Sequence, residues 1–399
     1  NMAKAIAATD IADTLKERHD GKLYCTPKPI FFEPFVSPFG DHTTLYYRKD
    51  WAEKLGLPVK DAYTIEEALN MAKAFKEKDP NGNGPGKTIG LAIEPGNMMT
   101  FFIRPNNTGW NTFYKKDGKY VWGPAEAETL EGLKTLKKYY QEGAVYKDFF
   151  TIKVRGEVEA MFNAGLTGLM YNGGAFGNVK RLYTAFGKEN PDKDSYESIG
   201  MANILGPDNK IHTTEFMNLQ SISYFNPNME DDKYERILDL IDYVATPEVQ
   251  NFIHLGFEGE DYRKEGDKIV ITRKKDKDGN PVPMAELNPS YYLWGMLIIA
   301  WDDFTARDPS TDPRLIETNK KLWTDRTNNG NMLRADYDRT FFTAPNYDKA
   351  LSVTNNVQND FTEIVVNQDD IEAAWRKYIG ENEKLIGEAL NELNSQLAK

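Results

Sequence analysis

A polar turn at residues 79–88 carries side chains that can bind a divalent cation. Asp79, Asn81 and Asn83 place oxygen atoms at alternate positions, and Pro85 adds a backbone carbonyl two positions later. Calcium loops begin in this way and are completed by a late carboxylate, where this chain has a lysine and a threonine. The four residues are therefore predicted ligands of a structural Ca²⁺ ion. The alternative is an Asn/Gly turn that caps the preceding helix, with the lysine ammonium among the oxygens.

Aromatic side chains are the second candidate for binding chemistry, because the chain has 21 Tyr, 21 Phe and 7 Trp. Aromatic rings stack on the apolar faces of sugars, while amides and charged groups bind the hydroxyls. Core packing is the expected role of most of these residues. Those that stand in loops after expected strands or beside glycine are the better candidates, among them Trp110, Tyr114, Tyr171, Phe176, Trp294 and Trp301.

Catalytic signatures are absent from the sequence, which lacks G-x-S-x-G, H-E-x-x-H, a Walker loop and G-x-G-x-x-G. Its four histidines are scattered without a partner at metal spacing, so structural or surface roles are expected. Cys25 is expected to be a buried thiol rather than a nucleophile. Among 61 acidic residues, some two could form the carboxylate pair of a glycosidase. The sequence gives no distances between them, so this carries little weight. No organic cofactor is predicted.

Length and charge limit the class of protein. A chain of 399 residues has room for two or three domains. The net charge of -12 argues against nonspecific nucleic-acid binding, and one cysteine excludes an intramolecular disulfide and a Cys-rich zinc site. The longest apolar run, 291–301, is too short to cross a bilayer. The first residues contain neither a signal-peptide core nor a lipobox cysteine, and they do not look like a natural start.

The elements that must position these residues alternate between strands and helices, which indicates an α/β class. A helix is predicted from Thr64 to about Lys78, with Thr64 and Glu67 as a capping box. Further helices are predicted at 124–142, 157–164, 174–187, 230–245, 247–254, 313–328 and 369–397, and strands at 89–93, 166–171, 199–204, 216–224 and 268–273.

Several segments, in order, resemble family 1 extracellular solute-binding proteins, the sugar-capturing components of bacterial ABC importers. The run LYYRKDWAEKLG at 45–56 resembles the family's tyrosine-lysine-aspartate segment, and DPNGNG at 79–84 its Asp-Pro-x-Gly-Asn-Gly turn. FNAGLTGLMYNG at 162–173 resembles a strand that enters a sugar-site loop, and GFEG at 256–259 follows a matching late helix. The subgroup it most resembles includes alginate-oligosaccharide-binding proteins.

The resemblance implies a two-lobed periplasmic-binding-protein type II fold, with each lobe a sheet flanked by helices and a hinge between them. We expect an N-lobe at 1–48 and 222–290 and a C-lobe at 49–221 and 291–399. The family's exported leader and the first part of its N-lobe have no counterpart here, so part of that lobe is expected to be missing.

The implied function is capture of an oligosaccharide in the cleft between lobes and delivery to a membrane permease, without catalysis. The expected protein is a monomer outside the cell, as a surface lipoprotein or in the periplasm. A carbohydrate-active enzyme with cleft carboxylates, and a sensory or adhesion module, are the alternatives. Arg104, Lys180 and Arg181 would suit an acidic glycan. The resemblance and the loop positions together predict sugar contacts from Tyr171, Asn172, Phe176, Trp110, Trp294, Trp301, Phe31 and Phe32.

Overall fold

The computed structural model describes residues 25–28, 43–215, 221–266, 268–275, 281–282, 284–290 and 311–397. They belong to two compact units, each made from two stretches of chain. The first unit is Asn1–Phe39 with Phe216–Glu317, and the second is Gly40–Glu215 with Thr318–Lys399.

A mixed seven-stranded sheet forms the centre of the second unit, in the order β13-β9-β8-β2-β7-β4 with β3 also paired to β8. β2 runs antiparallel to both of its neighbours, and Leu45 lies opposite Tyr171 of β7 and Ala202 of β8. Every residue of β7 is buried, which explains its nearly continuous apolar sequence. The strands of this sheet are β2 (Thr43–Arg48), β3 (Ala62–Thr64), β4 (Ile89–Ala92), β7 (Thr167–Gly173), β8 (Ile199–Leu205), β9 (Ile211–Thr214) and β13 (Gly330–Leu333).

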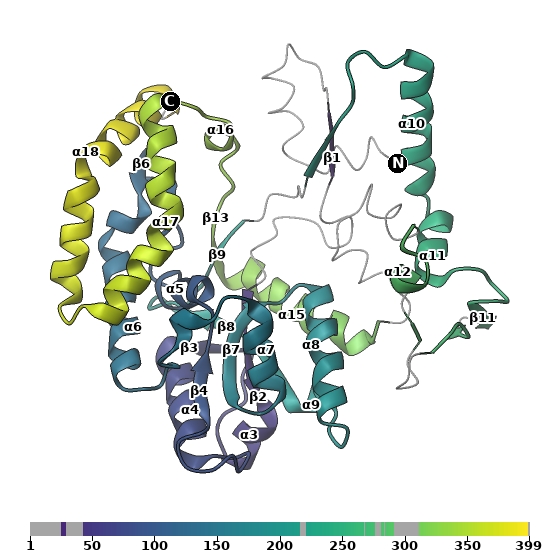
Figure 1. Cartoon of the computed structure of the whole chain (residues 1–399), viewed down its shortest axis with the longest axis horizontal. Helices are drawn as coiled ribbons and strands as arrows, with labels where there is room; N and C mark the ends of the chain where they lie inside the picture. The colour runs from purple at the N-terminus through teal and green to yellow at the C-terminus, as the bar shows by residue number, and fades with distance from the viewer. Residues whose placement is uncertain are drawn as a thin grey trace. The chain divides into compact units, whose positions relative to one another are not determined.

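Helices surround this sheet, and the long C-terminal pair packs together beside the hairpin that contains β6 (Figure 1). Trp122 of that hairpin donates its indole N–H to Thr354, and Trp375 donates to the Pro124 carbonyl. The hairpin strands are β5 (Phe113–Lys116) and β6 (Lys119–Trp122). The helices are α3 (Lys49–Lys54), α4 (Ile65–Lys78), α5 (Pro95–Ile103), α6 (Ala127–Gln141), α7 (Arg155–Asn163), α8 (Phe176–Glu189), α9 (Ser195–Ser198), α15 (Pro313–Asn329, entering from the first unit), α16 (Tyr337–Thr340), α17 (Pro345–Asn367) and α18 (Ile371–Leu397), with 3₁₀ turns at Gly123–Ala125 and Phe149–Thr151.

The described part of the first unit consists of short strands and helices. Cys25 on β1 is a buried free thiol, as expected. Ile241, Val244 and Ile253 form a small core between two helices. The elements are β1 (Cys25–Lys28), which pairs antiparallel with β10 (Ser221–Tyr224), the hairpin of β11 (Tyr262–Glu265) and β12 (Lys268–Ile271), and the helices α10 (Asp231–Val244), α11 (Pro247–Leu255) and α12 (Met284–Leu287).

The unit boundaries differ from the lobe boundaries expected from the sequence. Residues 43–48 were expected in the first lobe, but β2 pairs with β7 and β8 at the centre of the second unit's sheet. The later crossings fall at 215/216 and 317/318 instead of 221/222 and 290/291. Strand pairing therefore assigns residues 43–48 to the second unit, and the unit division itself falls at 39/40.

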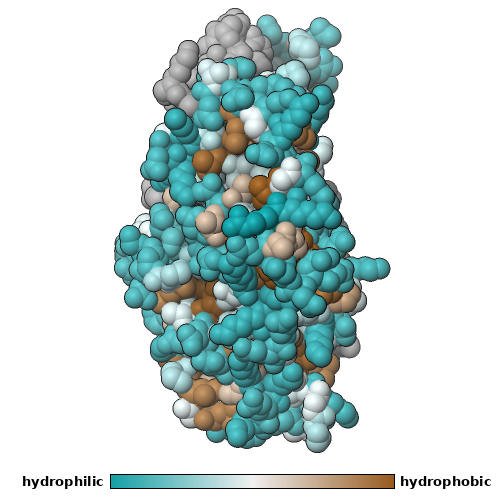
Figure 2. Space-filling model, turned by 90° about the vertical axis from the view of Figure 1, so that its left-hand side faces the viewer, coloured by the Kyte–Doolittle hydropathy of each residue, from teal (hydrophilic) through white to brown (hydrophobic). Residues whose placement is uncertain are grey.

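The surface of the molecule that carries α17 and α18 is mostly hydrophilic, and hydrophobic residues appear there in separate small patches (Figure 2). This agrees with the pattern of α18, where Trp375, Ile386 and Leu393 are buried and charged residues face outward. Among the described residues, no helix is long and apolar enough to cross a membrane.

Candidate functional site

A polar pocket in the second unit lies beside Tyr171, near the end of strand β7. β2, β8, β9 and helix α15 also contribute to its wall. The lining side chains that can form hydrogen bonds are Thr43, Arg104, Tyr171, Asn203, His212, Thr213 and Arg326. Their chemistry is that of recognition: hydroxyls, an amide, an imidazole and two guanidinium groups.

Thr43 is the centre of the hydrogen-bond network in this pocket. Its hydroxyl lies 3.0 Å from the Tyr171 hydroxyl and accepts a hydrogen bond from Nη1 of Arg104 at 3.0 Å. Its carbonyl accepts from Nη2 of Arg326 at 2.8 Å. Nε of Arg326 donates to the Asn203 side-chain oxygen at 2.7 Å, and both side chains are buried. The polar groups of three strands and two helices are thereby held in fixed directions.

His212 also lines the pocket, and both of its ring nitrogens have a polar partner. Its Nε2 lies 2.9 Å from a carboxylate oxygen of Asp208, and its Nδ1 lies 3.3 Å from the Thr108 hydroxyl. The hydrogen bond from His212 lowers the pKa of Asp208. The Tyr171 ring is fixed in turn by an edge contact with Phe101 of α5, with the centroids 5.3 Å apart.

Of the predicted sugar contacts, Tyr171 lines this pocket and Asn172 does not. Successive side chains of a strand point to opposite faces of the sheet. Asn172 accordingly turns away from Tyr171 and donates to Glu159 of α7 at 3.0 Å. Glu159 is also bound by Arg181, so this predicted acidic-glycan contact forms an ion pair with a buried carboxylate, while its own side chain stays 56% exposed.

Phe176 and Trp110 are core residues in this structure, which corrects the expectation that they stand free in loops. Phe176 begins α8 and has no exposed surface, with its ring 4.9 Å from that of Trp323. Trp110 is 2% exposed and stacks on Phe361 of α17 at 6.3 Å. Neighbouring glycines suggested open loops, but α15 and α17 cover these rings.

The other four predicted aromatic contacts, Phe31, Phe32, Trp294 and Trp301, lie outside the described residues. They stay predictions.

Sequence reasoning missed Asn203, His212 and Arg326 as site residues. A signal was present for Asn203, because an amide interrupts the apolar strand Ile199–Leu205. His212 was expected to have only a structural or surface role. Arg326 lies in the last turn of α15. From sequence alone, a basic residue there is expected to be solvated or to interact favourably with the helix C-terminus.

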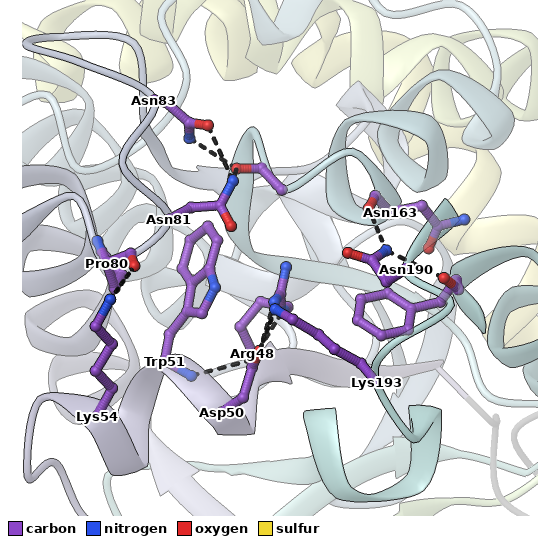
Figure 3. Close-up of polar contacts among 12 residues, drawn as sticks. Arg48, Asp50, Trp51, Lys54, Pro80, Asn81, Asn83, Asn163, Asn190 and Lys193 are labelled. Carbon is purple, nitrogen blue, oxygen red and sulfur yellow. Dashed lines mark hydrogen bonds and ion pairs between the residues drawn. The ribbon is translucent and has the colours of Figure 1, made fainter. Parts of the chain in front are cut away.

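The calcium-like loop of residues 79–88 lies in the same unit and is closed by its own hydrogen bonds. Asp79 has a left-handed backbone with φ of 46°, and its carboxylate accepts from the backbone N–H groups of Asn83 and Gly84. The Thr88 hydroxyl also donates to Asp79, at 2.5 Å, and lowers the pKa of that carboxyl group. The side-chain amides of Asn81 and Asn83, which point toward each other in Figure 3, both donate to the Gly165 carbonyl, at 3.3 and 2.8 Å.

Two curated proteins of Bacillus subtilis (strain 168) are similar in sequence, while no protein-family model matches the chain. The lipoprotein LipO is 25% identical over 243 residues, which cover 58% of this chain and 46% of LipO. The polygalacturonan/rhamnogalacturonan-binding protein YtcQ is 28% identical over 263 residues, or 65% of this chain and 49% of YtcQ. The chain thus spans about half the length of these relatives.

Solved structures share the fold over nearly the whole chain. The alginate-binding protein AlgQ2, in a structure without calcium ion, has a TM-score of 0.61 at 18% identity, covering 99% of this chain and 80% of AlgQ2. An EF-hand mutant of the substrate-binding protein FusA from Streptococcus pneumoniae, in complex with fructo-nystose, also has a TM-score of 0.61 at 18% identity. This match covers 96% of this chain and 79% of the FusA chain. These similarities agree with the resemblance stated above: the chain is similar in sequence to LipO, YtcQ and the ABC transporter substrate-binding protein FusA, and it has the α/β fold of AlgQ2 and FusA.

Proposed function

We propose that this chain is the extracellular solute-binding component of a bacterial ABC importer, and that it captures an oligosaccharide without chemical change. The polar groups beside Tyr171 carry the proposal, because hydroxyl, amide, imidazole and guanidinium groups match the hydroxyl and ring-oxygen chemistry of a sugar. The enclosed space among them is about 20 Å³, room for one water molecule, so these groups would contact the edge of a sugar and not enclose it. No described lining residue supplies a carboxylate, which glycoside hydrolysis requires in pairs. The names of YtcQ and FusA, both sugar-binding proteins, support the same reading.

The partner and the location follow from the same relatives. We propose delivery to a membrane permease, and attachment outside the cell as a lipoprotein or residence in the periplasm, because LipO is named a lipoprotein and FusA an ABC transporter substrate-binding protein. We also propose that the protein acts as a monomer. Gel filtration with light scattering tests this last point, and a stable dimer would contradict it.

A ligand screen tests the proposed function. The full chain is heated with neutral and acidic oligosaccharides, including fructans, oligogalacturonides and alginate oligomers, and each glycan is then weighed by mass spectrometry. A ligand at 100 times its dissociation constant stabilises a protein by about 2.7 kcal/mol, a rise of several degrees. A rise with the glycan intact supports the proposal. Cleaved glycan, or no response to any sugar, would overturn it.

The pocket is tested by a pair of matched variants, with the best ligand of that screen. Arg104→Met removes a guanidinium of the pocket wall, whereas Arg376→Met removes an exposed guanidinium from α18. Hydrogen bonds to charged groups contribute about 1.5–3 kcal/mol, so calorimetry should show a 10–100-fold weaker complex for the first variant only. Equal affinities would place the sugar elsewhere in the molecule.

A structural calcium ion was the remaining prediction, and AlgQ2 and the FusA EF-hand mutant connect the fold with calcium loops. Our proposed function does not include that ion. Among the described residues, no three His, Cys, Asp or Glu side chains are grouped to hold a metal. The donors of the 79–88 loop fit calcium poorly, because Lys87 and Thr88 stand where a calcium loop has its late carboxylate.

A further inference from the structure

The loop at residues 79–88 has the backbone of a calcium loop without its charge. Asp79 is the single carboxylate of these ten residues, and Lys87 balances it. The affinity of a calcium loop depends on the number of charged ligands, and a complete loop supplies a bidentate carboxylate late in the sequence. At positions nine and ten, where that carboxylate is needed, this chain has Lys87 and Thr88.

The hydroxyl of Thr88 uses its hydrogen-bonding capacity inside the loop. It donates to Oδ1 of Asp79 at 2.5 Å and accepts from the Asn83 amide at 2.9 Å. The side chain is buried, with 2% of its surface exposed. It therefore joins the first and third expected oxygen ligands, Asp79 and Asn83, directly to the end of the loop.

The amides of the loop are also used as donors and not only as oxygen ligands. Nδ2 of Asn81 donates to the side-chain oxygen of Asn83 at 3.0 Å, so a nitrogen occupies one direction from which a cation would approach that oxygen. Nδ2 of Asn83 donates to the Gly165 carbonyl at 2.8 Å. Gly165 has φ of +70°, and a Cβ there would lie 2.6 Å from Nδ2 of Asn81. The loop is thereby attached to the turn that begins β7, the strand of Tyr171.

A protein cation already contacts the loop from a neighbouring helix. Nζ of Lys54, at the end of α3, donates to the Pro80 carbonyl at 2.6 Å, a contact visible in Figure 3. Lys54 and Lys87 both add positive charge to the loop, which disfavours binding of a divalent cation.

We propose that this loop keeps its folded shape without a metal ion, because the Thr88 hydroxyl binds Asp79 and Asn83, two of the groups that a calcium ion would otherwise hold together. The Lys54 ammonium adds a second attachment through the Pro80 carbonyl. The loop then connects α4 to the turn before β7 through hydrogen bonds that need no metal ion. Capture of a ligand does not depend on calcium through this loop.

Calcium titration of the full chain tests the proposal. The melting temperature is measured in EDTA and in millimolar CaCl₂, and calcium binding is followed by calorimetry. We expect the same melting temperature in both solutions and no binding heat. Stoichiometric calcium binding at micromolar concentration, or a lower melting temperature in EDTA, would overturn the proposal.

A gain-of-binding variant shows whether the two late positions are what the loop lacks. Lys87→Asp with Thr88→Glu supplies the missing acids, and Lys87→Asn with Thr88→Gln is the matched uncharged control. We expect calcium to raise the melting temperature of the acidic variant by several degrees and to leave the control unchanged. A folded acidic variant that ignores calcium would contradict our assignment.

The role of the hydroxyl is tested separately, in case the double variants do not fold. Thr88→Val removes the hydroxyl at nearly constant volume, and Thr88→Ser keeps it. The valine variant should melt several degrees below the wild type in EDTA and in calcium alike, with the serine variant between them. A valine variant with the same melting temperature as the wild type would contradict the role proposed for the Thr88 hydroxyl.

Discussion

Arg48 is fully buried, which is rare for a residue that stays charged at neutral pH. Its guanidinium lies 4.6 Å from the ring centre of Trp51 and 5.1 Å from that of Phe186. Asp50 accepts two hydrogen bonds from it, at 2.8 and 2.6 Å, and is also bound by Lys193 (Figure 3). The aromatic rings and the carboxylate together make burial of this charge tolerable.

Asp50→Asn should therefore destabilise the second unit by about 3 kcal/mol at pH 7, because it leaves a buried charge without its counter-ion. Burial raises the pKa of Asp50, but the hydrogen bonds and charges of Arg48 and Lys193 outweigh it and hold the pKa below its usual value. The contribution of the Arg48–Asp50 pair to folding stability is thus fully present above the pKa of Asp50 in the unfolded chain, about 3.9. It is lost as the pH falls through the lower pKa of Asp50 in the folded protein. Urea unfolding between pH 7 and 3 measures both effects.

Lys193→Met is the matched control for that experiment, since it removes the other, more exposed partner of Asp50. A surface ion pair contributes about 0–1 kcal/mol, so this variant should stay close to the wild type. Equal losses for the two variants, or an Asp50→Asn protein whose stability falls as steeply below pH 4 as the wild type, would refute the role given to Arg48.

Single residues also show what the sequence could not reveal about the site. Tyr171 and Asn172 were predicted together, and only strand pairing decides that one faces the pocket and the other faces Glu159. The sequence could not show whether Trp110 and Phe176 are exposed or buried, because the residues that cover them, Phe361 and Trp323, come from helices far away in the chain. Arg326 reaches Thr43 from 283 positions along the chain.

At the scale of elements, helices with strong local signals were predicted well. The helix expected from Thr64 is α4, and the capping box of Thr64 and Glu67 is present in full. α5 and α17 were missed. The last six residues of α5 are all buried, so its sequence lacks the apolar and polar faces that mark an amphipathic helix. A proline in the first turn is not the reason, because α11 and α15 also begin with proline and were predicted.

The cap of α4 gives the prediction at this scale. The Thr64 hydroxyl accepts a hydrogen bond from the backbone N–H of Glu67, and the Glu67 carboxylate accepts one from the backbone N–H of Thr64. Thr64→Ala should cost about 1 kcal/mol, and Thr64→Ser should keep most of the cap. Circular dichroism melts should show a drop of about 2–4 °C for the alanine variant. An alanine variant with the melting temperature of the serine variant would show that the box contributes nothing.

At the scale of the whole molecule, two compact units with separate cores predict two thermal transitions. The second unit contains the large cluster around its sheet, whereas the described core of the first unit is the small group between α10 and α11. Burial of apolar surface is the main source of stability, so the second unit should melt at the higher temperature. Scanning calorimetry of the full chain measures both transitions.

The two units each have a threonine cap, which lets one substitution mark each transition. Thr64 caps α4 in the second unit, and Thr246 accepts from the backbone N–H of Val249 at the start of α11 in the first. Thr64→Ala should lower only the upper transition, and Thr246→Ala only the lower one. Were both variants to shift one common transition by equal amounts, with equal calorimetric and van't Hoff enthalpies, the two units would be one cooperative body. Separate shifts would instead mean that each unit unfolds independently. A ligand that binds only the pocket beside Tyr171 should then raise the temperature of the upper transition alone.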